Sequence, residues 1–436
     1  MLISFSVENW LSFRDEATLT LVAGRSRRHG GRLARVKKYG LRLLPIALLY
    51  GGNASGKSNF FQALRFAQDL VVSGRKIDAP TGVRPFLLDS PSLARPTRFE
   101  FELLIADTIY KFNFTMSSTA VLAESLTRVS AAREDQRLYT RRTEPDRVFH
   151  PGDSISGPER EELTAIHKRT RPNQLLLTAT IDQNFDLLRP VYDWFGNSLL
   201  LIAPELVPSL LFHPPRVHTD PLVARMSELL LQLDTGIARL DTRAIPLKKV
   251  DDTTYSPDIA PGLFPPYDRI VLLPNSSASM SEHKLLPARL VPYHRGTDGS
   301  EVEFKRDQES EGTRRLLDLL PHFIGLSEAG ETGRVLVIDE IDRSLHPLLT
   351  RALIASYLDD GCAAESRSQL LLTTHDVSLL DHRLFRPDEL WITERDESGV
   401  STLASFHEFT EAHHDRDLRG SYLRGRLGGI PRILFG

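Results

Sequence analysis

An eight-residue segment near the N-terminal end constrains the fold of this 436-residue chain more than any other feature. Residues 51–58 read GGNASGKS and match the pattern G-x-x-x-x-G-K-[ST] at every fixed position. Glycines let the backbone wrap closely round a phosphate chain and point its N–H groups at the oxygens. Lys57 adds a positive charge, and the Ser58 hydroxyl is a ligand for Mg²⁺. The segment predicts a loop that binds the phosphates of a nucleotide.

The elements on either side of this segment have the order that such a loop requires. Residues 45–50 (PIALLY) form a short apolar run, typical of a buried strand. Residues 58–73 place apolar side chains at three- and four-residue spacing, which predicts a helix that ends at Gly74. The loop would then lie at the positive end of this helix. An ordinary glycine-rich turn is the alternative.

Two later apolar runs end in polar side chains. Residues 335–338 (VLVI) precede Asp339 and Glu340, and residues 370–373 (LLLT) lead to His375. Open α/β sheets bind ligands at the carboxyl ends of their strands, so these side chains are expected beside the phosphates. Asp339 would hold Mg²⁺, Glu340 would polarise the attacking water, and His375 would hydrogen-bond the γ-phosphate. The alternatives are an ordinary surface pair of carboxylates and a structural histidine.

The segment at residues 309–313 reads ESEGT and precedes the helical run RRLLDLLP. Ser310, Gly312 and Thr313 suit a helix cap. An exposed helix N-terminus with a hydroxyl and a glycine can also receive a phosphate, here from the ATP of another subunit. Both interpretations stay open at this point.

Periodicity predicts the remaining elements more coarsely. Residues 2–8 and 17–22 are expected to form a hairpin, and residues 97–104 and 109–115 to form antiparallel strands. The other expected elements are a loop at 142–158, a helix at 221–240, a long irregular connection at 245–275, and alternating helices and strands, including 389–393, after residue 313. No repeat or sustained heptad is present, so a long coiled coil is not expected.

Composition limits the classes of protein to which the chain can belong. The length favours two lobes, and the net charge of −3 implies no general attraction to nucleic acid or membrane. The single cysteine, Cys362, excludes a disulfide framework within the chain. No apolar stretch is long enough to span a membrane, and residues 1–10 do not resemble a signal peptide, so we expect a cytoplasmic protein.

Two local clusters of basic residues depart from the overall charge. The first lies between residues 25 and 38, and the second between residues 416 and 432. Their members are Arg25, Arg27, Arg28, Arg32, Arg35, Lys37 and Lys38, and Arg416, Arg419, Arg424, Arg426 and Arg432. Such clusters can bind a phosphate backbone, but a solvated loop or a partner surface is an equal alternative. No aromatic residues interleave the first cluster to stack on bases.

The order of these motifs resembles that of the ABC ATPases of the SMC, RecF and OLD group. The chain is most similar to the OLD-like AAA ATPases of bacterial phage-defence operons. The segments that carry the resemblance are FSVENWLSF, YGGNASGKSN, PFLLD, RPNQLLLTA, ESEGTRRLLDLLP, VLVIDEIDRSLHP, LLLTTHD, DELWITERD and YLRGRLGGIP, which span residues 5 to 431.

The resemblance implies roles for individual residues. Each ATP would contact two subunits. One subunit would contribute the phosphate-loop residues Gly51, Asn53, Ala54, Ser55, Gly56, Lys57, Ser58 and Asn59. The other subunit would contribute Ser310, Gly312 and Thr313. Ser58, Asp339 and Gln183 would hold Mg²⁺, with Gln174 as the second candidate for the glutamine. Residues 342–346 would form the D-loop, which touches the opposite site. Two departures are the ESEGT signature, which replaces LSGGQ, and Leu11, which replaces a basic residue.

The resemblance also implies a fold. We expect an α/β ABC ATPase head, with a mixed sheet around the phosphate loop, an antiparallel β lobe, a helical lobe and no long coiled coil. The expected divisions are an N-terminal ABC segment at 1–125, a helical or insert lobe at 126–300 and a C-terminal ABC segment at 301–436. The two ABC segments would close one sheet, since Ser58 and Asp339 lie 281 positions apart.

Function follows from the resemblance as a further expectation. The chain would bind and hydrolyse ATP as a homodimer or higher homo-oligomer. It would act as a sensor or scaffold in phage defence that controls a separately encoded effector, either a TOPRIM-type nuclease or a toxin. The alternative is a RecF-like DNA-repair ATPase that binds DNA directly. A neighbouring nuclease-like gene would favour the first function, and tight ATP-dependent binding to DNA junctions would favour the second.

Overall fold

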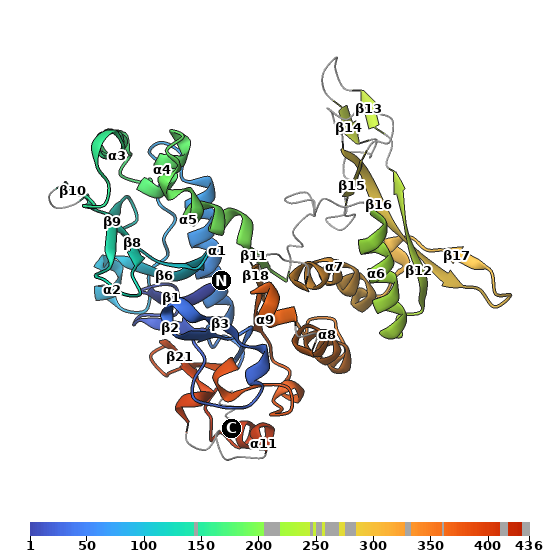
Figure 1. The fold of residues 1–436 in the computed structure, drawn as a ribbon. Coiled ribbons are helices and arrows are strands. Elements are labelled where there is room, and N and C mark those ends of the chain that lie inside the picture. The colour runs from blue at the N-terminus through green and yellow to red at the C-terminus, as the bar shows by residue number, and fades with distance from the viewer. Residues whose placement is uncertain are drawn as a thin grey trace. The chain divides into compact units, whose positions relative to one another are not determined.

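The computed structural model consists of two compact units. It describes residues 1–143, 147–204, 219–244, 247–249, 255–257, 270–274, 285–327, 333–359, 362–409 and 417–429. The first unit contains residues 1–201, 329–341 and 354–436, and the second contains residues 202–328 and 342–353 (Figure 1). The expected divisions at residues 125 and 300 stay a prediction.

A mixed six-stranded sheet forms the core of the first unit. Its order is β11 (Leu199–Ile202), β18 (Val335–Ile338), β19 (Gln369–Thr373), β5 (Ile46–Tyr50), β20 (Leu390–Arg395) and β21 (Ser401–Ser405). Strands β18, β19, β5 and β20 run parallel, and β21 is antiparallel to β20. Every residue of β18, β19 and β5 is buried, which explains their apolar runs. The two ends of the chain therefore close one sheet, as predicted.

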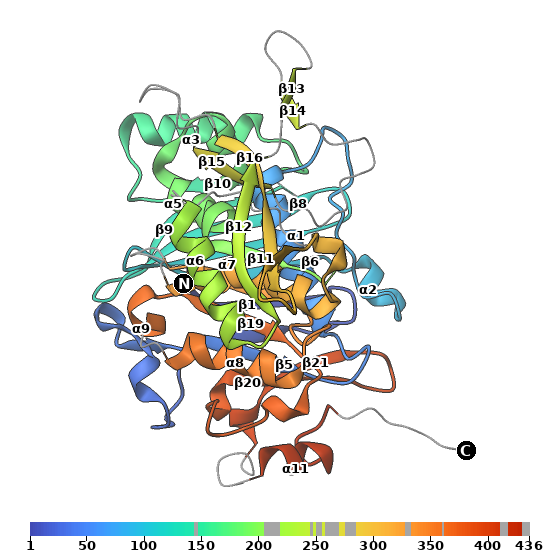
Figure 2. The same cartoon turned by 90° about the vertical axis from the view of Figure 1, so that its right-hand side faces the viewer.

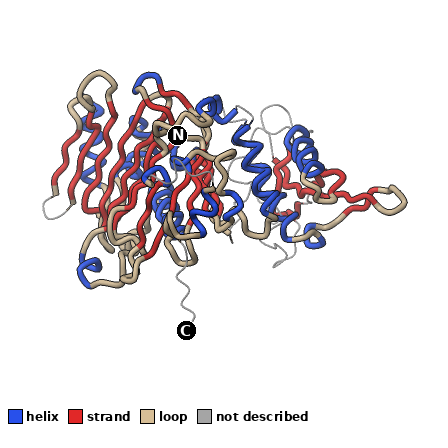
Figure 3. The backbone as a smooth tube through the Cα atoms, turned by 90° about the horizontal axis from the view of Figure 1, so that it is seen from below, coloured by secondary structure: helices blue, strands red, loops and turns tan. Residues whose placement is uncertain are grey.

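A second sheet of the first unit, whose strands are drawn in red in Figure 3, is antiparallel throughout. Its order is β10 (Val148–Pro151), β9 (Gln136–Arg142), β8 (Val121–Val129), β7 (Thr108–Met116), β6 (Thr97–Ile105), β1 (Leu2–Glu8) and β2 (Ala17–Thr20). The predicted hairpin and the predicted pair of antiparallel strands are both confirmed. The ring of Phe5 lies 4.7 Å from that of Phe101 and 5.1 Å from that of Phe60, so the first helix packs on this sheet.

Buried polar contacts join the parts of the first unit. The Gln369 side chain, fully buried, accepts from the Leu2 N–H at 2.7 Å and donates to the Leu2 carbonyl at 3.0 Å, which ties the core sheet to the antiparallel sheet. Two short strands, β3 (Ala34–Val36) and β4 (Leu41–Leu43), form a hairpin.

The helices of the first unit include the one predicted after the phosphate loop. They are α1 (Lys57–Ser73), α2 (Ser90–Ala94), α3 (Gly157–Arg169), α4 (Leu176–Asp182), α5 (Arg189–Asp193), a π-helical turn (Trp194–Ser198), α9 (Cys362–Ser366) and α11 (Leu418–Leu423). Helix α8 (Pro347–Asp359) begins in the second unit and ends in the first.

The second unit combines a four-stranded sheet with two helices (Figure 2). Its elements are α6 (Thr219–Gln232), β12 (Ile237–Ala244), β13 (Leu247–Lys249), β14 (Tyr255–Pro257), β15 (Ile270–Pro274), β16 (Leu285–Arg295), β17 (Glu301–Glu303) and α7 (Glu311–Ser327). Helix α6 packs on β12, where the Leu240 N–H donates to the Ser227 hydroxyl at 3.0 Å.

Three predicted elements differ from the structure. The loop at 142–158 contains β10, which pairs with β9, and α3 begins at Gly157. The helix at 221–240 ends at Gln232, because Asp234 has a left-handed φ of 51° and the chain turns there into β12. Within 245–275 the described residues belong mainly to short strands, and the rest of that segment lies outside the described residues.

The described helices are short. The longest, α1 and α7, have 17 residues each, so the described part of the chain contains no long coiled coil. None of the described helices has the length and apolarity that crossing a membrane requires.

Candidate nucleotide-binding site

The phosphate loop, residues 51–58, connects β5 to α1 at the carboxyl edge of the core sheet. Its backbone includes Ala54 with a φ of 60° and Gly51 with a φ of 156°. A Cβ on Gly51 would stand 2.5 Å from the carbonyl oxygen of Thr393 on β20, so only glycine fits. The Ser55 hydroxyl lies 2.7 Å from the Thr393 hydroxyl. Strand β20 therefore holds one side of the loop in place.

Lys57 begins α1 and is 5 % exposed. Its Nζ donates to the carbonyl oxygens of Gly51 at 2.8 Å and Gly52 at 3.1 Å. The Nδ1 atom of His375, which follows β19, lies 3.4 Å from Nζ. The loop carbonyls thus orient the ammonium group, and the core sheet brings together Lys57 and His375 across 318 positions of sequence.

Asp339 and Glu340 follow β18, the strand next to β19 in the sheet. Asp339 is 4 % exposed, and the Thr373 hydroxyl donates to its Oδ1 at 2.5 Å. The same hydroxyl accepts from the Glu340 N–H at 2.8 Å. Glu340 has a left-handed φ of 52°. This backbone conformation is uncommon for residues other than glycine and is often found at functional sites. Thr373 therefore fixes both the carboxylate and the turn that follows it.

A chain of hydrogen bonds lies beside the start of α1. The Asn59 amide donates to the Ser12 hydroxyl at 2.8 Å, and the Ser401 hydroxyl donates to the same oxygen at 2.7 Å. The Trp10 indole N–H donates to the Asn59 carbonyl at 2.9 Å, while its ring packs against both Phe66 and Phe99. Trp10 is 1 % exposed, so it supports the loop from the core.

Sequence reasoning did not identify Ser12, Thr373, Thr393 or Ser401. For Thr373 a signal existed, because a threonine ends the apolar run LLLT beside the predicted histidine. The other three gave none, since Ser12 and Ser401 are 389 positions apart and meet only in the folded chain.

The ESEGT segment lies in the second unit, at the start of α7. The Ser310 Oγ accepts from the Thr313 N–H at 3.1 Å and lies 2.8 Å from the Thr313 hydroxyl, which is a capping contact. The Ser344 hydroxyl, in the predicted D-loop, donates to Glu311 at 2.6 Å. A Cβ on Gly312 would stand 2.8 Å from the Ser344 carbonyl oxygen, so the two segments touch closely. The cap is present, and the role towards a second subunit stays a prediction.

The two candidate glutamines lie around α4. The Gln183 amide donates to the Ala179 carbonyl at 3.2 Å, and the Gln174 amide donates to the Asp182 carboxylate at 2.8 Å. Each bond lies within the α4 segment itself. A role for either glutamine at Mg²⁺ stays a prediction.

The residues at this edge of the sheet fit a magnesium–nucleotide complex. The described residues include no group of three or more His, Cys, Asp or Glu side chains that could hold a metal alone. Mg²⁺ commonly takes one or two protein ligands and completes its shell with phosphate oxygens and water. Asp339, oriented by Thr373, and Ser58, in the first turn of α1, match that donor set.

Four parallel strands at the centre of the core sheet, with a phosphate loop after β5 and paired carboxylates after β18, define a P-loop nucleotide-binding protein of the ATPase class. The chain belongs to the family described as "AAA domain, putative AbiEii toxin, Type IV TA system", whose model matches residues 46–200 and 218–381. This match covers more than half of the chain. It supports the ATPase class and leaves the closer resemblance to OLD-like proteins as a proposal.

Solved structures show a weaker similarity. Two are of the recombination mediator protein RecF in the RecFOR pathway, one described as RecF-ATP and one as RecF-ATPrS. They are 12% and 13% identical to this chain, cover 92% of it, and are themselves covered to 97% and 98%. The TM-scores are 0.34 and 0.31, values too low to indicate a shared function. No curated protein matches the chain.

Proposed function

We propose that the chain binds Mg²⁺ and ATP at the phosphate loop and hydrolyses ATP with the residues at the carboxyl edge of the core sheet. The observation that carries this proposal is the convergence of three separate segments. Lys57 lies 3.4 Å from His375, and Thr373, two residues before His375, bonds to Asp339 and to the backbone of Glu340. A structural role alone does not require a lysine, a histidine and two carboxylates near the carboxyl ends of three strands of one sheet.

The proposed mechanism assigns each side chain one task. ATP, when bound, supplies the phosphoryl group that is transferred to water. The loop N–H groups and Lys57 neutralise the phosphate charge, and Ser58 and Asp339 hold Mg²⁺. Glu340 orients the attacking water and accepts its proton. His375 hydrogen-bonds the γ-phosphate, and its 3.4 Å distance from Lys57 links that contact to the loop.

The proposal extends to assembly and biological role. Ser310, Gly312 and Thr313 of one protomer would contact the ATP held by its partner, so hydrolysis would require a dimer. Within one protomer the Ser344 hydroxyl donates to Glu311, so the signature and the predicted D-loop lie side by side, which supports this arrangement because both segments would face the partner's ATP. The family description names a putative toxin and a toxin–antitoxin system, which supports a role in a system of that kind. The role that we propose is control of a separately encoded toxin or nuclease during phage infection.

The test of this function is the Glu340→Gln variant, with Lys57→Ala for comparison. Glu340→Gln should retain ATP binding and lose about 100-fold or more of the hydrolysis rate, because the carboxylate acts on water. Lys57→Ala should lose ATP binding, measured by calorimetry. In cells, both variants expressed with the flanking genes should lose protection against phage. Wild-type hydrolysis by Glu340→Gln would contradict the mechanism. Undiminished protection by both variants would show that protection does not need ATP, and a lack of protection by the wild-type chain would contradict the defence role.

A further inference from the structure

One long stretch of the first unit contains no acidic residue. From residue 17 to residue 68 the chain has no Asp or Glu, although its net charge is −3. Within this stretch, residues 24–42 form what we call the basic loop. Its cations are Arg25, Arg27, Arg28, Arg32, Arg35, Lys37, Lys38 and Arg42. Charged residues of a solvated surface usually alternate in sign, so this stretch differs from an ordinary loop.

Most cations of the basic loop face solvent. All of them except Arg32 are exposed. The Lys38 ammonium donates to the backbone carbonyl of Asp107 at 3.2 Å, and the Arg42 guanidinium donates to that of Gly24 at 3.4 Å, so neither is neutralised by those bonds. Within the described part of the chain, Arg32 is the one member of the loop that forms an ion pair.

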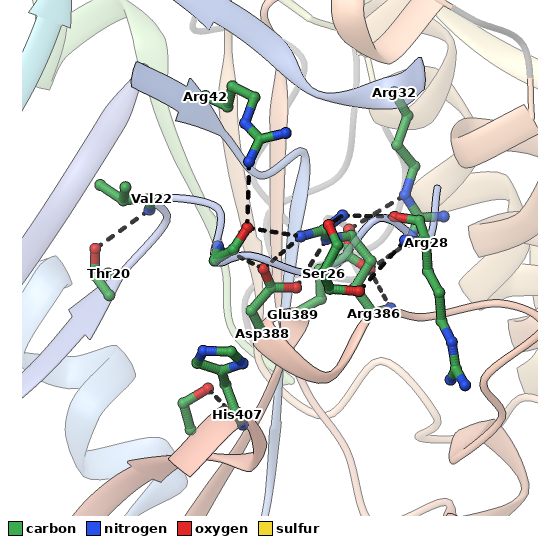
Figure 4. Close-up of polar contacts among 12 residues, drawn as sticks. Thr20, Val22, Ser26, Arg28, Arg32, Arg42, Arg386, Asp388, Glu389 and His407 are labelled. Carbon is green, nitrogen blue, oxygen red and sulfur yellow. Dashed lines mark hydrogen bonds and ion pairs between the residues drawn. The ribbon is translucent and has the colours of Figure 1, made fainter. Parts of the chain in front are cut away.

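A fully buried arginine holds the backbone of the basic loop (Figure 4). The Arg386 guanidinium donates to the carbonyl oxygens of Ser26 at 3.0 Å and Arg28 at 2.5 Å. Its charge is balanced by Asp388 at 2.6 Å, which also accepts from the Gly24 N–H at 2.7 Å. Buried charges are retained where they are paired and hydrogen-bonded, as Arg386 is here. The start of the loop is therefore fixed from inside the protein.

A second buried pair fixes the middle of the loop. Arg32, 8 % exposed, forms an ion pair with the fully buried Glu389 and donates to the Leu384 carbonyl at 2.9 Å. Asp388 and Glu389 thus pair with the internal arginines Arg386 and Arg32. The exposed cations keep their charge, on a backbone whose conformation is already set.

The chemistry of this surface favours one kind of partner. A protein interface usually contains a core of exposed apolar side chains, and the large exposed hydrophobic residues of the described chain all lie outside residues 24–42. The two aromatic rings of residues 24–42 are both held by the protein: the Tyr39 hydroxyl donates to the Val129 carbonyl at 3.1 Å, and the His29 Nε2 atom lies 3.2 Å from the His382 carbonyl oxygen. Cations on a fixed backbone, without large exposed apolar side chains among them, suit a repeating phosphate chain.

We propose that the basic loop binds the sugar–phosphate backbone of nucleic acid independently of base sequence. Fixing a flexible segment on binding costs conformational entropy. The contacts of Arg386 and Arg32 already hold the backbone of the basic loop before binding, which lowers that cost. Binding should weaken steeply with salt, because each phosphate contact releases counterions. Duplexes should bind at least as well as single strands, since stacking contributes nothing. This binding does not depend on the proposed ATP hydrolysis.

The test uses the full chain and fluorescently labelled 30-base-pair duplexes of DNA and RNA, with the matching single strands. Arg27→Ala/Lys37→Ala should weaken duplex binding by about tenfold or more at 0.1 M salt and lower the slope of log K against log salt by about two. The matched control is Lys168→Ala/Arg169→Ala, an exposed basic pair at the end of α3, which should change neither. Arg27→Lys/Lys37→Arg keeps the charge and should retain binding.

Further measurements separate the alternatives. Equal melting temperatures of the variants exclude misfolding as the cause, and Lys57→Ala should bind duplexes normally, which distinguishes this site from the phosphate loop. Failure of the full chain to bind any duplex would overturn the proposal. So would equal losses in the loop variant and the control. Tighter binding of polyglutamate than of the duplex at equal charge concentration would also overturn it, and would indicate an acidic polypeptide as the partner.

Discussion

At the scale of single residues, the Thr373 hydroxyl has two partners at the candidate site. It donates to Asp339 and accepts from the Glu340 N–H, so one oxygen orients two groups with different proposed tasks. Neither bond could be predicted from the sequence, because Thr373 lies 34 positions from Asp339 and the two strands become neighbours only in the sheet. The positions of the lysine, the carboxylates and the histidine at this edge of the sheet could be predicted, because Lys57 completes the phosphate-loop pattern and the other three follow apolar runs, whereas their roles stay a prediction.

Thr373→Val should test this positioning role. The variant keeps the shape of the side chain and leaves the buried Asp339 without its donor, at a cost of about 1–3 kcal/mol in the free energy of unfolding. We expect kcat for ATP hydrolysis to fall by about tenfold or more, with a much smaller change in ATP affinity. Thr373→Ser keeps the hydroxyl and should restore kcat. An unchanged kcat in Thr373→Val would show that the hydroxyl is not needed at the site.

At the scale of elements, the sequence predicted correctly the helices and strands whose apolar spacing allows a single interpretation. β5, α1 and the β6–β7 pair were found because a buried strand, an amphipathic helix and alternating strands each have a distinct period. β12 was missed because Ile237 and Leu240 continue the helical spacing of α6, although the turn at Asp234 separates them from it. β10 was missed because it is short and polar, and it exists by pairing with β9.

The junction of β8 and α4 depends on one buried carboxylate. Glu124 forms an ion pair with Arg141 at 2.7 Å and accepts from the N–H groups of Leu176 and Leu177 at 2.7 and 3.0 Å. Both charged side chains are at most 2 % exposed. These bonds satisfy free N–H groups at the start of α4 and attach that helix to the antiparallel sheet.

Glu124→Gln should therefore destabilise the chain by about 3–5 kcal/mol, because Arg141 would remain as a buried charge without its partner. Urea unfolding followed by circular dichroism measures the change. The control is Glu100→Gln, whose ion pair with Arg98 is exposed and should be worth about 0–1 kcal/mol. Equal effects of the two substitutions would show that the Glu124 network does not stabilise the fold.

At the scale of the whole molecule, the first unit holds the phosphate loop, Asp339, Glu340 and His375, whereas the second holds Ser310 and Gly312. The sequence order of these motifs predicted an ATPase of the ABC type, and the family match supports the ATPase class. No local pattern reveals whether the signature serves the ATP of its own protomer or that of its partner, because this depends on assembly.

The central claim is that each ATP site combines the phosphate loop of one protomer with the signature of its partner. The most direct test counts the ATP molecules that a covalently linked dimer retains after rapid gel filtration. Two lesions are used, Lys57→Ala in the phosphate loop and Gly312→Asp in the signature, whose side chain would displace the Ser344 carbonyl of its own chain and place a carboxylate beside the γ-phosphate of the partner's ATP. If each site combines the loop of one half with the signature of the other, lesions in opposite halves leave one intact site, and both lesions in the same half leave none. We therefore predict one retained ATP in the first dimer and none in the second. The reverse result would contradict the account, because it would mean that each chain completes its own site.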